Sequence, residues 1–234
     1  MPNTVARKLA NGAALQADDK ERLRDLIRDW RTVPARTDII RHGDDPEFVH
    51  AILEGIACRY KILPDGRRSI MALLIPGDWC DMHIAILGRM DHSIGTLTPC
   101  RVVDIARSEI EELLQNHPRI ARAMWWATLV DEAVLREWLV NMGKRRADRQ
   151  MAHLFCELYL RFASIGWAED FALPMTQEQL ADTLGITVVH AQRVIATLRD
   201  DGLIDIRDRQ IAIPDIRRLM DFAEFDPDYL HLPY

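Results

Sequence analysis

Glycine and proline recur at short intervals between residues 34 and 99, and this spacing limits what that part of the chain can form. Neither residue suits the interior of a helix or of a central strand. The positions are Pro34, Gly43, Pro46, Gly55, Pro64, Gly66, Pro76, Gly77, Gly88, Gly95 and Pro99. Short strands with regular turn signals are typical of a small β-barrel or jelly roll, so we expect a β-domain here.

The stretch from residue 58 to residue 66 shows the pattern locally. Apolar and basic side chains alternate over residues 58–62, as in a half-buried strand. Pro64-Asp65-Gly66 then predicts a turn, because proline presets φ and glycine accepts a positive φ. Further on, Ser108-Glu-Ile-Glu111 has the sequence of a capping box, which predicts the start of a helix.

Residues 119–142 contain no glycine or proline and predict one long helix. Its apolar residues form three stripes, so the helix must be covered on several sides. The first stripe is Ala123, Ala127, Val130, Val134 and Trp138, the second is Trp126, Leu129 and Ala133, and the third is Leu135, Leu139 and Met142. We expect the first stripe to pair with a second copy of the chain; a helix buried within one monomer is the alternative.

A basic cluster follows Gly143, where we expect the long helix to end. The predicted domains are residues 1–118, a β-domain with flanking helices; residues 119–143, the dimerisation helix; and residues 144–234. The fold class is therefore α+β, and the third domain carries the most informative motif.

Residues 175–204 have the sequence of a helix-turn-helix. Thr176 and Gln179 form a capping box, and the first helix ends near Gly185. Thr187 caps a second helix over 187–200, which ends before Gly202. Two helices joined by a short turn with glycine are typical of this motif.

A hairpin follows the second helix. Residues 203–206 and 211–213 are apolar or alternating, and the charged turn Arg207-Asp208-Arg209 separates them. This order of elements predicts a winged helix-turn-helix, and hence DNA binding.

With these motifs the sequence resembles the Crp/Fnr family, the family of the cyclic-AMP receptor protein. The features that carry the resemblance are the Pro76-Gly77-Asp78 turn in the β-domain, the long helix, the stretch Leu180-Ala-Asp-x-Leu-Gly-Ile-Thr187 and Arg193. The resemblance covers almost the whole chain. It implies a cyclic-nucleotide-binding-like β-roll sensor, a homodimer and a sequence-specific transcription regulator.

In such a motif the second helix lies in the major groove of DNA. Arg193 can contact guanine, Gln192 adenine, and a valine the methyl group of thymine. The expected DNA-binding residues are Thr176, Gln177, Thr187, Val188, Val189, His190, Gln192, Arg193 and Arg199. Thr176, Gln177 and Arg199 suit phosphates. Val188 and Val189 replace an arginine-glutamate or valine-glutamate pair that is frequent in the family, so we expect a different palindromic operator.

The resemblance also points to an effector pocket around Gly77, Asp78, Cys80, Asp81, Met82, His83, His92 and Ser93. Cyclic-nucleotide receptors of the family use a Gly-Glu and an Arg-Ser pair, whose positions here hold Asp81-Met82 and His92-Ser93. An added carboxylate and a lost arginine oppose a buried phosphate, so we do not expect cyclic AMP. An Fnr-type iron–sulfur cluster is not expected either, because no cysteine precedes Cys58.

Residues 80–83 leave several alternatives open. The haem-containing members that sense carbon monoxide have cysteine and histidine in this region and an N-terminal proline, which Pro2 and Met82-His83 match in kind. Cys80, however, is offset by one residue. A redox-sensitive thiol at Cys80, and a metal at Cys80, Asp81, His83 or His92, are further alternatives. No metal ligand is assigned, and the cofactor stays unknown.

No catalytic motif is found: the histidines are scattered, and the sequence has no phosphate-binding glycine loop and no nucleophile elbow. We therefore expect no enzyme, with a non-DNA-binding, ligand-gated interaction module as the other alternative. The N-terminus has no secretory apolar run and no stretch could span a membrane, so a cytoplasmic location is expected. The expected partners are double-stranded DNA, RNA polymerase, a second copy of the chain and a small-molecule effector; the net charge of −6 does not exclude a local DNA-binding surface.

Overall fold

Short strands occupy the segment rich in glycine and proline, as predicted. The structure, a computed structural model, describes residues 3–167, 171–207 and 210–232. The strands of this segment are β1 (Trp30–Val33), β2 (Asp38–Ile40), β3 (Phe48–Glu54), β4 (Ala57–Ile62), β5 (Arg68–Leu74), β6 (Ser93–Thr96) and β7 (Cys100–Ala106). The predicted turn at Pro64-Asp65-Gly66 lies between β4 and β5.

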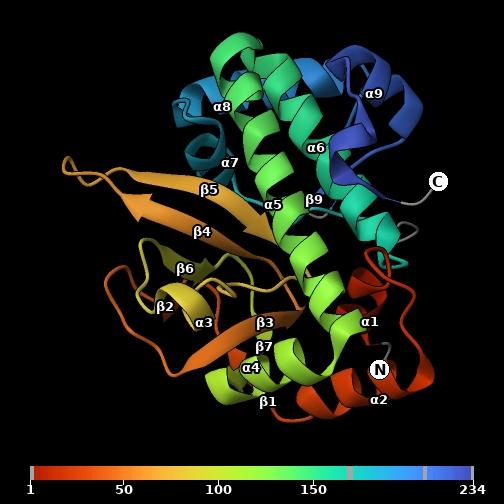
Figure 1. Cartoon of the computed structure of the whole chain (residues 1–234). Helices are drawn as coiled ribbons and strands as arrows, with labels where there is room; N and C mark the ends of the chain where they lie inside the picture. Colours follow the sequence, from red (N-terminus) through yellow and green to blue (C-terminus); the bar gives the residue numbers. More distant parts are fainter. Residues whose placement is uncertain (1–2, 168–170, 208–209, 233–234) are drawn as a thin grey trace. The chain divides into compact units, whose positions relative to one another are not determined.

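These strands form two sheets, with the orders β1-β7-β3 and β2-β6-β4-β5. The described strand pairs are antiparallel, and Figure 1 shows β4 and β5 side by side as a long hairpin. Apolar side chains of the strands share one buried core with the neighbouring helices. The predicted β-roll is confirmed. In β4, however, burial does not alternate as the sequence predicts: Ala57 and Cys58 are buried, and Lys61 and Ile62 at the other end of the strand are exposed.

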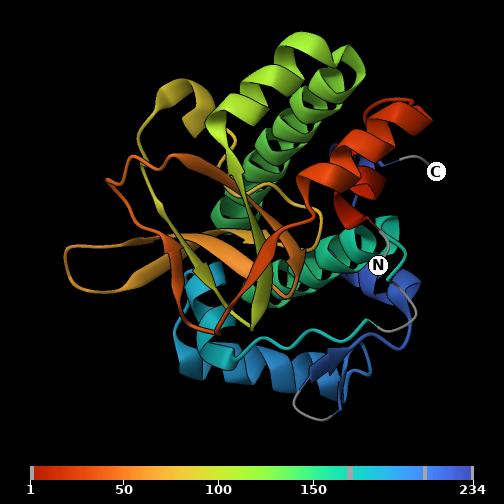
Figure 2. The same ribbon diagram turned by 90° about the horizontal axis from the view of Figure 1, so that it is seen from below.

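Helices close the β-roll at its ends. They are α1 (Thr4–Leu9), α2 (Ala17–Leu26), the short α3 (Ile84–Leu87) and α4 (Arg107–Asn116). Figure 2 shows α1 and α2 together near the N-terminus. The capping box predicted at Ser108 is wrong: α4 begins at Arg107 after Ala106, which makes no side-chain cap. Strand β7 continues to Ala106, where it pairs with Phe48, so the helix starts without a separate cap residue.

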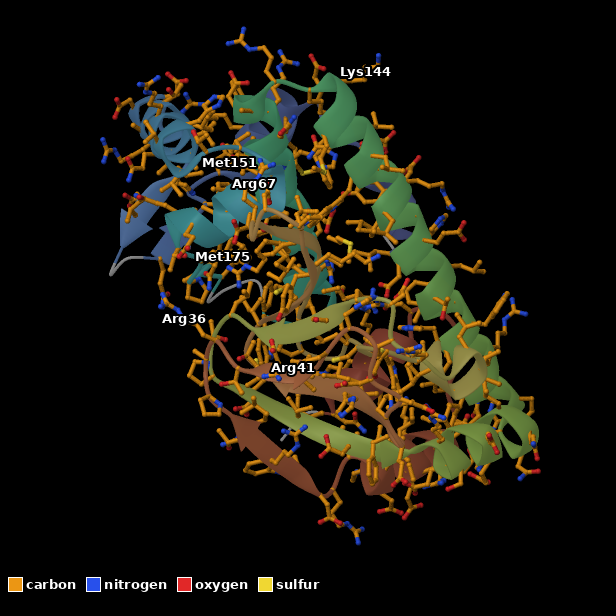
Figure 3. The ribbon with its side chains drawn as sticks, turned by 90° about the vertical axis from the view of Figure 1, so that its left-hand side faces the viewer. Arg36, Arg41, Arg67, Lys144, Met151 and Met175 are labelled. Atoms are coloured by element: carbon orange, nitrogen blue, oxygen red, sulfur yellow. The ribbon has the colours of Figure 1, made fainter. Side chains whose placement is uncertain are left out.

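The long helix is α5 (Pro118–Lys144), one continuous helix that includes Gly143. Figure 3 labels Lys144 at its end. The prediction that Gly143 ends the helix is therefore wrong by one residue. The chain divides into two compact units, residues 1–65 with 71–129 and residues 66–70 with 130–234, so α5 contributes to both.

The second unit continues with helices and one small hairpin. Its elements are α6 (Ala147–Ser164), α7 (Gln177–Leu184), α8 (Val188–Asp200), β8 (Asp205–Arg207), β9 (Gln210–Ala212), α9 (Ile216–Ala223) and the 3₁₀ helix η1 (Pro227–Leu230). Met151 lies in α6, and Met175 precedes α7 (Figure 3). In the described part of the chain, no helix has the length and apolarity to span a membrane.

Candidate DNA-binding and effector sites

The helix-turn-helix begins with the predicted capping box. The Thr176 hydroxyl oxygen accepts a hydrogen bond from the backbone N–H of Gln179 at 3.2 Å. The Gln179 side-chain oxygen accepts one from the backbone N–H of Thr176 at 2.8 Å. Helix α7 ends at Gly185, whose φ of 65° is left-handed and favours glycine. Both ends of α7 are therefore fixed by residues within the motif.

The Thr187 hydroxyl caps α8 by accepting from the backbone N–H of His190. The apolar face of this helix is buried through Ala191, Val194, Ile195 and Leu198. All nine predicted DNA-binding residues lie on exposed positions. Helix α8 therefore packs its apolar face against the rest of the C-terminal unit. Its other face, which includes two valines, is exposed to solvent.

A side-chain contact ties the two helices together on their exposed side. The Gln192 amide donates to the Gln177 side-chain oxygen at 2.8 Å. Arg199 pairs with Asp200 at 3.2 Å, an exposed ion pair that contributes little to stability. The hydroxyls of Thr176 and Thr187 accept capping bonds, which leaves each O–H hydrogen able to donate to a phosphate oxygen.

The predicted wing corresponds to β8 and β9, which pair in antiparallel register from Asp205–Ala212 to Arg207–Gln210. The turn residues Asp208 and Arg209 lie outside the described residues, as does Pro2 near the N-terminus. The hairpin is therefore present, but its first strand starts later than predicted and includes Arg207, which the sequence analysis placed in the turn.

The segment 77–81 of the β-roll runs along β3. The N–H groups of Gly77 and Cys80 donate to the carbonyls of Ile52 and His50, at 2.8 Å each. Gly77 has a φ of 95°, and a Cβ there would lie 2.8 Å from the Thr4 carbonyl oxygen. Asp78 is buried; it accepts from the Ile75 N–H at 2.9 Å and pairs with Lys8. Gly77 and Asp78 thus build the turn itself.

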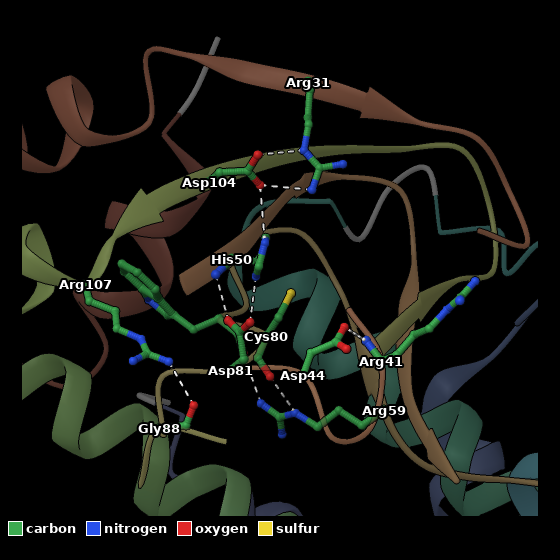
Figure 4. Close-up of polar contacts among 11 residues, drawn as sticks. Arg31, Arg41, Asp44, His50, Arg59, Cys80, Asp81, Gly88, Asp104 and Arg107 are labelled. Carbon is green, nitrogen blue, oxygen red and sulfur yellow. Dashed lines mark hydrogen bonds and ion pairs between the residues drawn. The ribbon is translucent and has the colours of Figure 1, made fainter. Parts of the chain in front are cut away.

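Asp81 is completely buried and binds His50 twice. One carboxylate oxygen accepts from the His50 backbone N–H and the other meets Nδ1, both at 2.6 Å. The other ring nitrogen of His50 lies 3.5 Å from Asp104, which Arg31 holds through two hydrogen bonds of 2.7 and 3.0 Å. Figure 4 shows this chain of polar contacts across three strands and the loop. The carboxylate of Asp81 therefore anchors the loop to β3.

Cys80 is also fully buried. Burial raises the pKa of its thiol well above the usual value, with a further contribution from the neighbouring Asp81 carboxylate. Arg59 donates to the backbone carbonyls of Cys80 and Trp79 at 2.9 and 3.0 Å, as Figure 4 shows for Cys80. A reactive cysteine needs exposure and a low pKa, so these features disfavour a redox-sensitive thiol at Cys80.

His83 and His92 lie together, with ring centroids 5.3 Å apart. Asp91 completes this group: one ligand atom from each of the three residues lies within 4.8 Å of those of the other two. Asp91 meets His92 Nδ1 at 2.5 Å, and this hydrogen bond lowers the pKa of the carboxyl. Burial lowers the pKa of both imidazoles, and the charge of Arg59 adds to this effect.

The predicted effector residues therefore fall into two groups. Gly77, Asp78, Cys80 and Asp81 are buried in the loop and its contacts with β3. Met82 is partly buried against the core. His83 and His92 converge, whereas Cys80 is not part of that group. The Ser93 hydroxyl accepts from the His42 N–H at 3.0 Å. The sequence analysis did not include Asp91 among the site residues. Its position next to His92 in the sequence would have been a reason to include it.

The five residues predicted for the dimer interface are buried in the folded chain. They are Ala123, Ala127, Val130, Val134 and Trp138, none more than 9% exposed. Trp138 also donates its indole N–H to the buried Glu157 carboxylate at 2.8 Å. The exposed apolar residues of α5 lie elsewhere; they are Trp125, Leu129, Leu135, Leu139, Val140 and Met142. The first stripe is therefore occupied within the chain, contrary to the expectation that it faces a second copy.

Comparisons with known proteins agree with both halves of the structure. Residues 30–117 match the sequence model of the cyclic nucleotide-binding domain, and residues 149–222 match that of the Crp-like helix-turn-helix domain. The transcriptional activator protein FnrL of Cereibacter sphaeroides is 30% identical over 220 residues, which cover 90% of this chain and 87% of FnrL.

One further relative and one solved structure are similar to most of the chain. The nitrogen fixation regulation protein FixK of Bradyrhizobium diazoefficiens is 29% identical over 169 residues, 72% of this chain and 70% of FixK. The solved structure of FixK2 from Bradyrhizobium japonicum has a TM-score of 0.73 at 23% identity, and the match covers 82% of this chain and 96% of that one. The similarity to FixK2 shows that the two chains share a fold.

Proposed function

The chain belongs to the Crp/Fnr family of transcription regulators, and we propose that two copies of it bind a palindromic operator, with α8 of each copy in the major groove. Its relatives are transcription regulators and not enzymes, and regulators of this type bind DNA and are dimeric. The observation that carries the proposal is the exposed face of α8, because the opposite, apolar face of this helix is buried. The exposed residues are Val188, Val189, Gln192 and Arg193.

The chemistry of this face assigns a role to each side chain. Arg193 donates to the O6 and N7 atoms of a guanine, and the two valines pack on thymine methyl groups. Gln192 forms hydrogen bonds with adenine. In the free protein its amide donates to Gln177 instead, so this hydrogen bond must break before Gln192 can bind the base. Thr176, Gln177 and Arg199 bind phosphates, and Thr187 and His190 flank the helix N-terminus, where N–H groups favour an anion.

Replacement of Arg193 by alanine tests this assignment. In a mobility-shift titration on a palindrome selected from genomic fragments, Arg193→Ala should weaken specific binding by about 1–3 kcal/mol, roughly 5- to 150-fold. Arg199→Ala is the matched control, because a lost phosphate contact weakens binding to all sequences about equally. Unchanged binding by Arg193→Ala would exclude this placement of α8.

The exposed residues of α5 support a dimer interface different from the first stripe. Trp125, Leu135, Leu139 and Met142 recur at spacings that fit a heptad seam of two helices. Glu132, at 62% side-chain exposure, falls between them and pairs with Arg136 at 2.8 Å. We infer that this seam, and not the stripe from Ala123 to Trp138, pairs the two copies.

The β-roll is the proposed sensor, and its signal is not cyclic AMP. Where the resemblance to cyclic-nucleotide receptors would require an Arg-Ser pair for the phosphate, this chain has His92 beside the Asp91 carboxylate, and Ser93 already accepts a hydrogen bond from His42. Cys80 packs in the hydrophobic core and is not part of the group that His83 forms with Asp91 and His92, so we infer no shared haem site of Cys80 and His83. We also infer RNA polymerase as a partner, since relatives such as FnrL are transcriptional activators, and a cytoplasmic location, where the DNA lies.

A further inference from the structure

We propose that His83, His92 and Asp91 form a binding site for a divalent transition-metal cation, with zinc as the representative ion. The two histidines supply Nε2 atoms as ligands. Asp91 is a positioning residue that holds His92 through Nδ1. Water or another small ligand completes the coordination. The site lies where the chain enters α3 at His83 and where β6 begins after His92.

The first argument is the state of the two imidazoles. The Nε2 atoms of His83 and His92 are both buried, and neither has a hydrogen-bond partner among the residues that the structure describes. His92 itself is only 8% exposed. Buried polar atoms are normally paired, so two unpaired ring nitrogens on neighbouring rings require an explanation. Imidazole nitrogen is the ligand that zinc, copper, nickel and iron share.

The second argument is the geometry of the carboxylate. Histidines that bind metals commonly donate their other ring N–H to a carboxylate, which fixes the tautomer and the ring orientation. Asp91 stands in this relation to His92, with 2.5 Å between its oxygen and Nδ1. This contact assigns the proton to Nδ1 and leaves the lone pair on Nε2 for the cation.

The third argument concerns distance. The three residues offer ligand atoms within 4.8 Å of one another. Ligands on one tetrahedral zinc lie roughly 3.4 Å apart for bonds of about 2.1 Å, so small side-chain rotations bring the ring nitrogens of His83 and His92 to the separation that one ion needs. His83 is half-buried, so its ring has room for such a rotation.

One neighbouring charge acts against a cation. Arg59 lies close enough to lower the pKa of both histidines, whereas Asp81 and Asp91 act in the opposite direction on His83. The Arg59 guanidinium is engaged with the carbonyls of Trp79 and Cys80. The site therefore suits a soft, imidazole-preferring ion bound with moderate affinity, and not magnesium or calcium, which prefer oxygen ligands.

Calorimetric titration of the untagged, chelator-stripped full-length chain with zinc chloride tests the proposal. Wild-type protein should bind about one zinc ion per chain, and magnesium should give no binding. His83→Gln and His92→Gln should each abolish this binding. Asp91→Asn should weaken it by about 10- to 100-fold, as expected for a group that orients a ligand, while the thermal unfolding of the metal-free protein stays unchanged.

His117→Gln provides the matched control. His117 also lies beside a carboxylate, Glu112, at 3.2 Å, but it is not part of a group of three metal-binding side chains in the described ranges. This variant should bind zinc as the wild type does. Absence of zinc binding in the wild type, or equal binding by the His83→Gln/His92→Gln double variant, would overturn the proposal. If His92→Gln fails to fold, His83→Gln at its half-buried position decides the outcome. No DNA is present, so failure here leaves the proposed DNA reading intact.

Discussion

Asp81 shows how a single buried carboxylate fixes a loop. Its two oxygens satisfy the backbone N–H and Nδ1 of His50, and nothing of the side chain is exposed to solvent. Asp81→Asn replaces one acceptor oxygen by a donor, which leaves a buried N–H without a partner. The free energy of unfolding should fall by about 1–3 kcal/mol in a denaturant titration.

Asp25→Asn is the control for this substitution. Asp25 is an exposed aspartate that pairs with Arg28 on the surface, at 2.6 Å, and its loss should cost less than about 1 kcal/mol. Equal effects of the two substitutions would mean that Asp81 does not anchor the loop.

His153 predicts a specific pH dependence of stability. Burial, aided by the charge of Arg145, lowers its pKa to about 3 from the usual 6.5. Glu137, whose carboxylate lies 3.3 Å from Nε2, opposes this shift, and Phe225 and Tyr229 cover the ring. Below pH 6.5 the unfolded chain takes up a proton that the folded chain does not. Stability is therefore lost as the pH falls from about 6.5 toward 3, by up to about 2 kcal/mol at pH 5.

The measurement compares wild type with His153→Gln in denaturant titrations at pH 7 and pH 5. The variant lacks this titration, so its stability should fall less over the same interval. Burial raises the pKa of Glu157, so the protonation of this residue increases stability as the pH falls. This contribution is present in both proteins, so it cancels in the comparison. Parallel pH profiles of the two proteins would show that His153 gains its proton as easily in the folded state.

At the scale of helices and strands, the sequence predicted best what depends on neighbours along the chain. The caps of α7 and α8 form between residues three apart, so Thr176 and Thr187 were identified correctly. Ser108 carries the same local signal and does not cap a helix. There, β7 pairs with β3 up to Ala106 and the helix follows at once. A long-range pairing overrides the local preference, and the sequence alone does not contain it.

The candidate sites show the same limit. The residues from Cys80 to His83 are neighbours in the sequence, yet they have different surroundings in the structure. Pairing of 77–81 with β3 buries Cys80 and Asp81, whereas His83 directly precedes α3 and lies beside His92. For α5, periodicity revealed three apolar stripes but not which of them the chain covers itself. The stripe from Ala123 to Trp138 is buried, and Leu135, Leu139 and Met142 are exposed. Only tertiary packing assigns these faces.

At the scale of the whole molecule, the proposed function requires two copies, because one α8 reads one half-site. Binding of a palindrome by a preformed dimer makes the second contact intramolecular, which strengthens binding by about 10²- to 10⁴-fold over a single half-site. Acidic residues outnumber basic ones between 144 and 234, so a single reader has little general attraction for DNA. Dimerisation should therefore control operator affinity.

Leu139→Glu tests this dependence. Leu139 is 74% exposed in the single chain, and a charge there would be buried without a partner if the seam of α5 pairs two copies. We expect sedimentation analysis to give a monomer at micromolar concentration and the palindrome affinity to fall by about 10²-fold or more. Ile62→Glu, on β4 and 58% exposed, is the matched control and should remain a dimer. Arg193→Ala should weaken operator binding while the protein stays a dimer, which separates base recognition from dimer assembly. A Leu139→Glu protein that still sediments as a dimer would place the interface on another surface.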